Sequence, residues 1–214
     1  MTASARDSAI LEITRAAIRG DSLAEILGTA SGAIKKTMPY DRMSISLYSP
    51  EHRALTLTAV DGQGPNSFYQ PGLILDTEGS PQGWVFQHQK PIVRQDLIRE
   101  RAFRLEQTSL DEGVKSYCAL PLIAKGESIG VISLASYRKN SFSEAHLNVL
   151  QEISDQFVLV IKSLMPTCPE HSFTRLICPR CTGSGGGRTT VAKHKERLSE
   201  WGKQGGRGRR KDQF

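Results

Sequence analysis

Four residues near the carboxyl end have the types and spacing of a zinc site. Cys168 and His171 form a C-x2-H pair, and Cys178 and Cys181 form a C-x2-C pair after a gap of six residues. A two-residue gap lets both ligands of a pair turn back to one ion, and three thiolates with one imidazole suit tetrahedral Zn²⁺. We therefore predict one zinc ion in residues 166–182, with His194 as a rival fourth ligand. The alternative is a reduced, flexible segment that holds no metal.

The residues that follow predict a flexible basic tail. Residues 166–214 carry 11 Lys and Arg against 4 Asp and Glu, whereas residues 1–165 carry 17 against 18. In residues 183–214, glycine permits close approach, and arginine pairs with phosphates and stacks on bases. We predict nucleic-acid contact through Arg207, Arg209, Arg210 and Lys211. The string is similar to a minor-groove AT-hook but lacks the proline between two arginines, and the alternative is a solvated tail.

The first 165 residues show no arrangement for catalysis. In these residues, no serine or cysteine is placed beside a histidine by the sequence. Cys118 lies alone within an apolar strand pattern, which is typical of a small buried side chain. We predict that the protein is not an enzyme.

Composition and hydropathy predict a globular, cytoplasmic protein. The chain has 214 residues, of which 38% are hydrophobic and 23% charged. No apolar run approaches the ~20 residues that a membrane helix needs, so we expect no membrane contact. Residues 1–19 mix charged with apolar side chains and show no cleavage site of small residues, so we expect no secretory signal.

Apolar periodicity and turn residues predict an α+β fold with five helices and five strands. The expected helices cover 6–19, 22–37, 80–89, 97–105 and 143–164, and the expected strands cover 43–48, 55–58, 91–93, 117–123 and 128–134. Ser80 and Pro81 have the types expected at the start of a helix. Pro121 lies inside an expected strand and therefore predicts an edge position or a bulge.

The last expected helix carries a heptad pattern. Its apolar positions at steps of three and four are Leu150, Ile153, Phe157, Val160 and Leu164. One apolar face could cover the sheet while this one meets a partner helix, which predicts a homodimer. The alternative is a single broad buried face.

Six strings in the same order resemble the GAF domain, a family of small-ligand sensor domains. The matching segments are 39–45, 79–85, 90–97, 116–122, 129–134 and 142–144, and the resemblance covers residues 7–164. It implies a mixed, mainly antiparallel sheet with the terminal helices packed on one face and a ligand pocket on the other. It also implies that the terminal helices pair with those of a second subunit.

The resemblance implies a pocket lined by apolar and aromatic groups with a few polar anchors. The residues at the corresponding positions are Phe68, Tyr69, Trp84, His88, Arg94, Asp96, Tyr117 and Ser133. Each has a structural alternative: Trp84 as a core residue, His88 as a solvent-facing one, and Asp96 as a helix cap.

The versions of the family with known ligands do not match. Cyclic-nucleotide-binding domains carry a longer signature, of which only 140–144 is similar. The sulfoxide reductases of the family use several cysteines within the domain, whereas residues 1–165 contain Cys118 alone.

The leading hypothesis is a non-catalytic sensor that binds an unidentified small molecule and forms a homodimer, with the basic tail as output or docking element. The alternative is a ligand-free dimerisation module whose tail binds zinc and contacts nucleic acid.

Overall fold

The computed structural model describes residues 3–36, 38–50, 52–62 and 67–164. The predicted zinc ligands, their rival His194 and the predicted nucleic-acid contacts all fall beyond residue 164, outside the described residues. Within these ranges, no helix combines the length and the apolar character needed to cross a bilayer.

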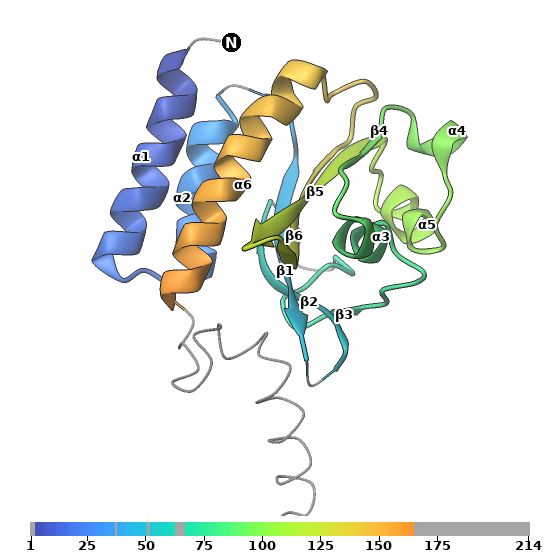
Figure 1. Ribbon diagram of the computed structural model, residues 1–214. Coiled ribbons are helices and arrows are strands. Elements are labelled where there is room, and N and C mark those ends of the chain that lie inside the picture. Colours follow the sequence, from blue (N-terminus) through green and yellow to red (C-terminus); the bar gives the residue numbers. More distant parts are fainter. Residues whose placement is uncertain (1–2, 37, 51, 63–66, 165–214) are drawn as a thin grey trace, which may run out of the picture.

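A six-stranded sheet forms the centre of the molecule (Figure 1). The strands are β1 (Arg42–Ser49), β2 (Ala54–Asp61), β3 (Ile74–Leu75), β4 (Ile92–Arg94), β5 (Ser116–Ala124) and β6 (Glu127–Ser136). Their order across the sheet is β3-β2-β1-β6-β5-β4, and each pairs antiparallel with its neighbours. Hairpins join β1 to β2 and β5 to β6, as the sequence predicted.

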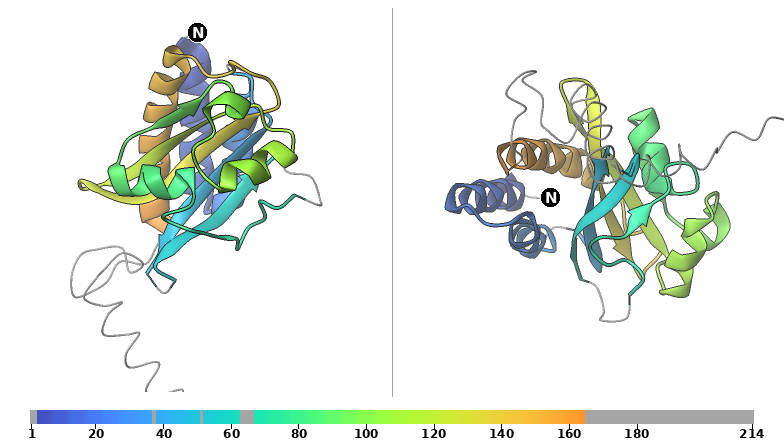
Figure 2. Two further views of the ribbon diagram at one scale, coloured as in Figure 1. Left: turned by 90° about the vertical axis from the view of Figure 1, so that its right-hand side faces the viewer. Right: turned by 90° about the horizontal axis from the view of Figure 1, so that it is seen from below.

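Three long helices cover one face of this sheet. They are α1 (Ala3–Arg19), α2 (Leu23–Ile34) and α6 (Glu144–Leu164). The view from below in Figure 2 shows all three on the same side of the strands. Their apolar side chains bury a large core against residues such as Met43, Ile45 and Leu120 of the sheet. The predicted α+β fold with terminal helices on one face is confirmed.

Short helices and loops cover the opposite face. They are α3 (Pro81–His88), α4 (Leu97–Glu100) and α5 (Leu105–Asp111). A second, smaller core lies beneath them and includes Leu55, Val85, Leu97 and Val131. The ring of Phe86 on α3 stacks on Tyr48 of β1 with centroids 5.0 Å apart. The sheet therefore has one face for the helical core and one for a more open cover.

Local signals fix where α2 and α3 begin. Ser22 and Glu25 form a complete capping box at α2. Ser80 accepts a hydrogen bond from the Gly83 N–H at 3.0 Å, and Pro81 occupies the first turn of α3. These starts match the sequence-based expectation.

The expected helix over 97–105 is wrong in its extent. Two short helices, α4 and α5, replace it, and α5 continues to Asp111. The carboxylate of Glu106 accepts the N–H groups of Ala102 and Phe103, at 2.6 and 2.7 Å. Those donors therefore bond to a side chain rather than to the preceding helical turn, and the chain changes direction between α4 and α5.

The predicted disruption at Pro121 has a clear structural basis. Pairing between β4 and β5 runs from Arg94–Tyr117 to Ile92–Ala119 and stops two residues before Pro121. The missing N–H of this proline therefore costs no bond with β4, although β5 as a whole lies inside the sheet.

The heptad face of α6 is buried within the subunit. Leu150, Ile153, Phe157 and Val160 are buried in the helical core together with Val149, Val158 and Ile161. This is the single broad buried face that the sequence left as the alternative. Leu164 alone among the five heptad positions is exposed.

Candidate ligand site

The floor of the site is a set of residues opposite one another on neighbouring strands. One row crosses four strands and contains Arg42 (β1), Ala135 (β6), Tyr117 (β5) and Arg94 (β4). The next row on the same face contains Ser44, Ser133 and Ala119. Small side chains thus occupy the second row and the Ala135 position of the first, and they leave space between the sheet and the elements above it.

That space is a small cavity of about 30 Å³. Its lining consists of Arg42, Ser44, Tyr69, Pro81, Gln82, Ser109, Val114, Tyr117, Ser133, Leu134 and Ala135. A cavity of this size holds about one or two waters. The side-chain oxygen Oε1 of Gln82 is buried and has no hydrogen-bond partner among the described residues. The lining is therefore polar and still offers an acceptor.

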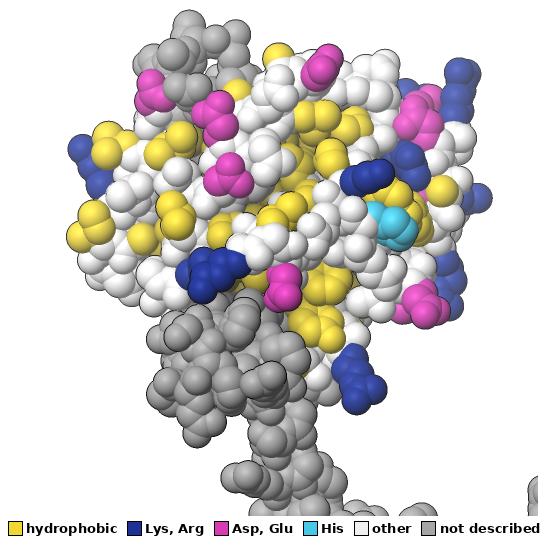
Figure 3. Space-filling model, in the orientation of Figure 1, with side chains coloured by type: hydrophobic (Ala, Val, Ile, Leu, Met, Phe, Trp, Pro, Cys, Tyr) yellow, Lys and Arg dark blue, Asp and Glu magenta, His cyan; other side chains and the backbone are white. Residues whose placement is uncertain are grey.

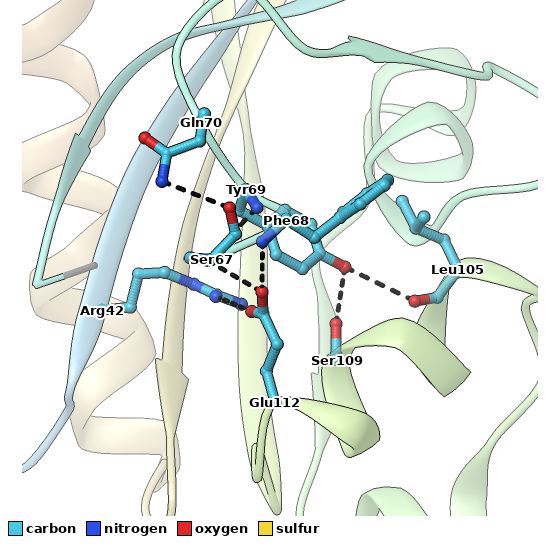
Figure 4. A network of polar contacts seen from close by, with 8 residues as sticks. All are labelled: Arg42, Ser67, Phe68, Tyr69, Gln70, Leu105, Ser109 and Glu112. Atoms are coloured by element: carbon cyan, nitrogen blue, oxygen red, sulfur yellow. Dashed lines mark hydrogen bonds and ion pairs between the residues drawn. The ribbon is translucent and has the colours of Figure 1, made fainter. Parts of the chain in front are cut away.

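Arg42 and Glu112 close one end of the cavity (Figure 4). Nη1 of Arg42 lies 2.5 Å from Oε2 of Glu112, and its guanidinium lies over the Tyr69 ring at 4.2 Å. The other carboxylate oxygen of Glu112 accepts the Ser67 hydroxyl at 2.8 Å and the Phe68 N–H at 2.5 Å. One carboxylate thereby joins β1, the end of α5 and the segment 67–70.

Tyr69 connects the segment 67–70 to α5. Its hydroxyl lies 2.7 Å from the Ser109 hydroxyl and donates weakly to the Leu105 carbonyl at 3.4 Å. Burial raises the pKa of Tyr69 above its ordinary value, so the phenol is neutral at physiological pH. The aromatic ring therefore acts as a neutral wall between the cavity and solvent.

Glu106 holds the opposite end. Its side chain is fully buried and accepts four donors: the Tyr117 hydroxyl at 2.5 Å, Arg94 Nε at 3.2 Å, and the two N–H groups described above. Burial, together with the hydrogen bond to Glu106, raises the pKa of Tyr117. A buried carboxylate with four donors is well satisfied, so this end is firmly fixed.

The three polar contacts of α5 lie on one helical face. Glu106, Ser109 and Glu112 are spaced three apart, which places them along one side of a short helix. They meet Arg94, Tyr69 and Arg42 respectively. Helix α5 thus lies across the row of opposed residues, with an ion pair at each end and the cavity beneath.

The hydrogen bonds around Glu112 keep its carboxylate ionised. Burial alone would raise the pKa of Glu112, but the hydrogen bonds from Arg42, the Phe68 N–H and Ser67 together lower it below its ordinary value. The carboxylate is therefore charged at physiological pH and attracts the Arg42 guanidinium.

A comparison with protein families identifies the architecture. The family model described as GAF domain matches residues 20–162. The chain belongs to the GAF domain family. No curated protein sequence matches it.

Solved GAF-type structures share the fold at low sequence identity. The GAF domain of a phosphoenolpyruvate-protein phosphotransferase from Coxiella burnetii superposes with a TM-score of 0.63 at 20% identity, covering 75% of this chain and 95% of that one. The free methionine-R-sulfoxide reductase from Neisseria meningitidis, in complex with its substrate, gives 0.61 at 15%, covering 77% and 93%. A phycocyanobilin-bound GAF domain from a cyanobacterial phytochrome gives 0.58 at 19%, covering 73% and 93%.

In this GAF domain, three of the eight predicted site residues line the cavity, namely Tyr69, Tyr117 and Ser133. Arg94 lies at the Glu106 end of the same row and contacts the ring of Phe103 at 6.0 Å from its centroid. The structure therefore brings four of the predicted residues into one network.

The other four predicted residues lie outside the cavity lining. The ring of Trp84 packs at the edge of the smaller core and stacks on His88, whose side chain is exposed, with centroids 4.4 Å apart. Phe68 is exposed and meets Tyr69 edge-on. Asp96 stands at the start of α4 without a side-chain cap bond and pairs with Lys139 at 2.8 Å.

The sequence reasoning missed most of the charged site. It placed Arg42 at the entry to a strand and assigned no role to Ser44, Gln82, Glu106, Ser109 or Glu112. One usable signal was the spacing of three between Glu106, Ser109 and Glu112. A polar face of that kind normally points to solvent, and only the two arginines of the GAF sheet turn it inward.

Cys118 is fully buried, as predicted, and burial raises the pKa of its thiol. The described residues contain no cluster of histidine, cysteine and acidic side chains able to hold a metal ion.

Proposed function

We propose that this GAF domain is a non-catalytic sensor that binds one small polar molecule between the sheet and α5. The observation that carries the proposal is the cavity above the small residues Ser44, Ser133 and Ala135, with Arg42 at one end and the buried Glu106 cluster at the other. In a family whose members are typically sensors of small ligands, this is the natural place for one.

Binding requires the cavity to enlarge. Small-molecule pockets measure about 300–1,000 Å³, whereas this cavity measures about 30 Å³. Its roof consists of the short helix α5, the first turn of α3 and the segment around Tyr69, none of which is a strand of the central sheet. Movement of this roof would admit a ligand while the sheet stays intact.

Strand β1 offers a route from the ligand to the helical layer. Arg42 and Ser44 face the cavity, while Met43 and Ile45 between and beside them pack into the helical core. A ligand that binds the open form better than the closed form would shift the balance between them, and β1 would transmit the difference to α1, α2 and α6.

We further propose a homodimer that pairs through α1 and α6. The heptad face is buried within the subunit, so other residues must form the dimer interface. Leu11 and Ile18 on α1 are seven apart and exposed, and Leu159 and Leu164 on α6 are exposed as well, at a spacing of five. Figure 3 shows hydrophobic side chains at several points on this part of the surface. The zinc-binding and nucleic-acid-binding roles of the tail stay predictions.

One observation favours a second function, that of a ligand-free interaction module. Glu106 and Glu112 are both paired with arginines, and the cavity is small. A domain that served only to dimerise would retain such a filled pocket.

Two cavity-filling variants distinguish these functions. Ser133→Leu and Ser44→Leu place a large side chain into the cavity, and Thr58→Leu adds the same side chain at an exposed position of β2. If the protein is a sensor, it should retain a small molecule in native mass spectrometry or gain thermal stability from a compound in a metabolite library. Both cavity-filling variants should lose this binding or stabilisation, whereas Thr58→Leu should keep it. Wild-type protein that is empty and unresponsive to the library would instead support the interaction module.

A further inference from the structure

Of the residues that line the cavity, Arg42 alone carries a charge. Its side chain is only 9% exposed, compared with 19% for its partner Glu112. The arginine therefore lies deeper than the glutamate, at the boundary between the cavity and the end of α5. A guanidinium this deeply buried needs an anionic partner, because an unpaired buried charge is strongly destabilising.

Glu112 is the one part of this pair that can leave without dismantling the sheet. Arg42 belongs to β1, whose register with β6 begins at Arg42 itself. Glu112 is the C-cap of α5, and the next residue, Gly113, has a positive φ of 87°. At the far end of α5, Glu106 is fixed by its four donors. The helix is consequently held firmly at its start, whereas the Glu112 carboxylate beyond its end is the ionic link to β1 and the segment 67–70.

The same carboxylate holds the segment 67–70. If Glu112 moves away, the Ser67 hydroxyl and the Phe68 N–H lose their acceptor at the same time as Arg42 loses its anion. Opening of the roof and exposure of the cationic site are therefore one event. An incoming carboxylate can restore the charge balance at Arg42, because it replaces one carboxylate by another.

The remaining groups restrict the ligand further. Gln82 Oε1 is a buried acceptor without a partner among the described residues, so it suits a ligand with an O–H or N–H donor. The second arginine nearby, Arg94, is paired with Glu106 and does not line the cavity. One available cation favours a ligand with one negative charge over a dicarboxylate or a phosphate dianion.

We infer that the ligand is a small monocarboxylate with a hydroxyl or amino donor, and that its carboxylate displaces Glu112 from Arg42 and thereby releases the segment 67–70. This inference rests on the proposed sensor function. Glu112 acts as a built-in substitute for the ligand's carboxylate and keeps the site closed in its absence.

The test uses glycolate, the smallest hydroxycarboxylate, as a probe of the full chain. Glu112→Gln removes the competing carboxylate, and Glu127→Gln makes the same change at the exposed first residue of β6. An intramolecular competitor acts at an effective concentration of about millimolar. We therefore expect glycolate to bind Glu112→Gln at least about tenfold more tightly than the wild type or Glu127→Gln, at constant ionic strength. The neutral analogue glycolamide and sodium chloride should bind no more tightly to Glu112→Gln than to the wild type.

A second measurement on the wild type does not depend on the variant. Saturating glycolate should accelerate hydrogen exchange at the Phe68 amide, since its acceptor has moved, but not at the Phe103 amide, which Glu106 holds. Equal binding of glycolate and glycolamide, no binding of glycolate to either protein, or an unchanged Phe68 amide would overturn the inference. If the wild type binds a neutral ligand and Ser133→Leu does not, the sensor function is supported and the inference of a monocarboxylate ligand is wrong.

Discussion

Arg42 and Arg94 lie in the same row across four strands, and each is paired with a glutamate from one face of α5. With strands spaced about 4.8 Å apart, three spacings separate the two arginine backbones by roughly 14 Å. Helix α5, whose seven residues cover about 10 Å, lies above the sheet between the two arginines, and the long side chains bridge the remaining distance. The two ion pairs therefore decide how closely the helix approaches the floor and how large the cavity is.

The two pairs are not equivalent. Glu106 is fully buried, with four donors, whereas Glu112 is partly exposed and shares its oxygens between the sheet and the segment 67–70. Loss of the Glu106 carboxylate would leave four donors without their acceptor in the interior, whereas the Glu112 carboxylate is 19% exposed and can move toward solvent while another anion takes its place at Arg42. The first pair is thus part of the fold, and the second can serve as a switch.

The first prediction compares the stabilities of these sites. Glu106→Gln should lower the free energy of unfolding by about 3–5 kcal/mol, because Arg94 and two N–H donors lose a charged acceptor. Glu127→Gln, at the exposed first residue of β6, should stay within about 0.5 kcal/mol of the wild type. Urea unfolding measures both values. A Glu106→Gln protein as stable as Glu127→Gln would contradict the buried network.

The second prediction concerns acid stability. The pKa of Glu112 is lower in the folded protein than in the unfolded chain, so the folded state binds fewer protons near this pKa. Stability from this group is complete above its unfolded pKa of about 4.3 and is lost as the pH falls through the lower folded value. In Glu112→Gln, the unfolding free energy should therefore decline less steeply between about pH 5 and pH 3.

Urea unfolding at a series of pH values checks this difference, and Glu127→Gln is its control. Asp61, whose pKa is also lowered, contributes to both proteins and cancels in the comparison. Parallel profiles for the wild type and Glu112→Gln would show that Glu112 has no special stabilising partners.

The third prediction concerns the approach of α3 to the segment before it. A Cβ at Gly83 would lie 2.3–2.5 Å from backbone atoms of Thr77, which is too close for any side chain. Gly83→Ala should therefore displace α3 and its residue Gln82 from the cavity and destabilise the protein by roughly 1–3 kcal/mol. Gly32→Ala is the matched control, because a Cβ there meets nothing within 4 Å and alanine favours a helix by up to about 1 kcal/mol.

Thermal unfolding should accordingly move in opposite directions for the two variants. A Gly83→Ala protein with an unchanged or raised melting temperature would mean that the segment around Thr77 adjusts freely.

The sequence predicts those parts of the fold that local chemistry determines. The start of α3 follows from a capping serine before a proline, and β5 and β6 follow from apolar runs joined by a tight turn at Lys125 and Gly126. The resemblance of six strings in the same order, together with the order of the elements, predicted the GAF-type sheet with its terminal helices on one face.

The charged site depends on contacts between distant residues and could not be derived in the same way. Arg42 and Glu112 are 70 positions apart, and only the register of β1 with β6 turns Arg42 toward the cavity. The position of α5 itself is set by Glu106, whose bonds to Ala102 and Phe103 separate it from α4. The GAF resemblance implied Trp84 as a pocket residue by its position, but Trp84 stacks on His88 and does not belong to the cavity lining.

The last prediction tests the proposed homodimer with substitutions at two equally exposed aliphatic residues. Leu159 on α6 and Ile98 on α4 are both 61% exposed, but they lie on opposite sides of the sheet. If α1 and α6 form the interface, Leu159→Glu should weaken the dimer by at least about tenfold, because a charge would be buried against apolar side chains. Ile98→Glu should leave association unchanged.

Ile18→Glu provides an independent check from the other helix of the interface, since Ile18 is 81% exposed. Sedimentation equilibrium over a range of protein concentrations measures all three variants. Exposed positions tolerate such changes with little loss of stability, so weaker association would report on the interface and not on folding. Equal dissociation constants for Leu159→Glu, Ile18→Glu and the wild type would exclude this face, and a monomeric wild type would exclude the dimer.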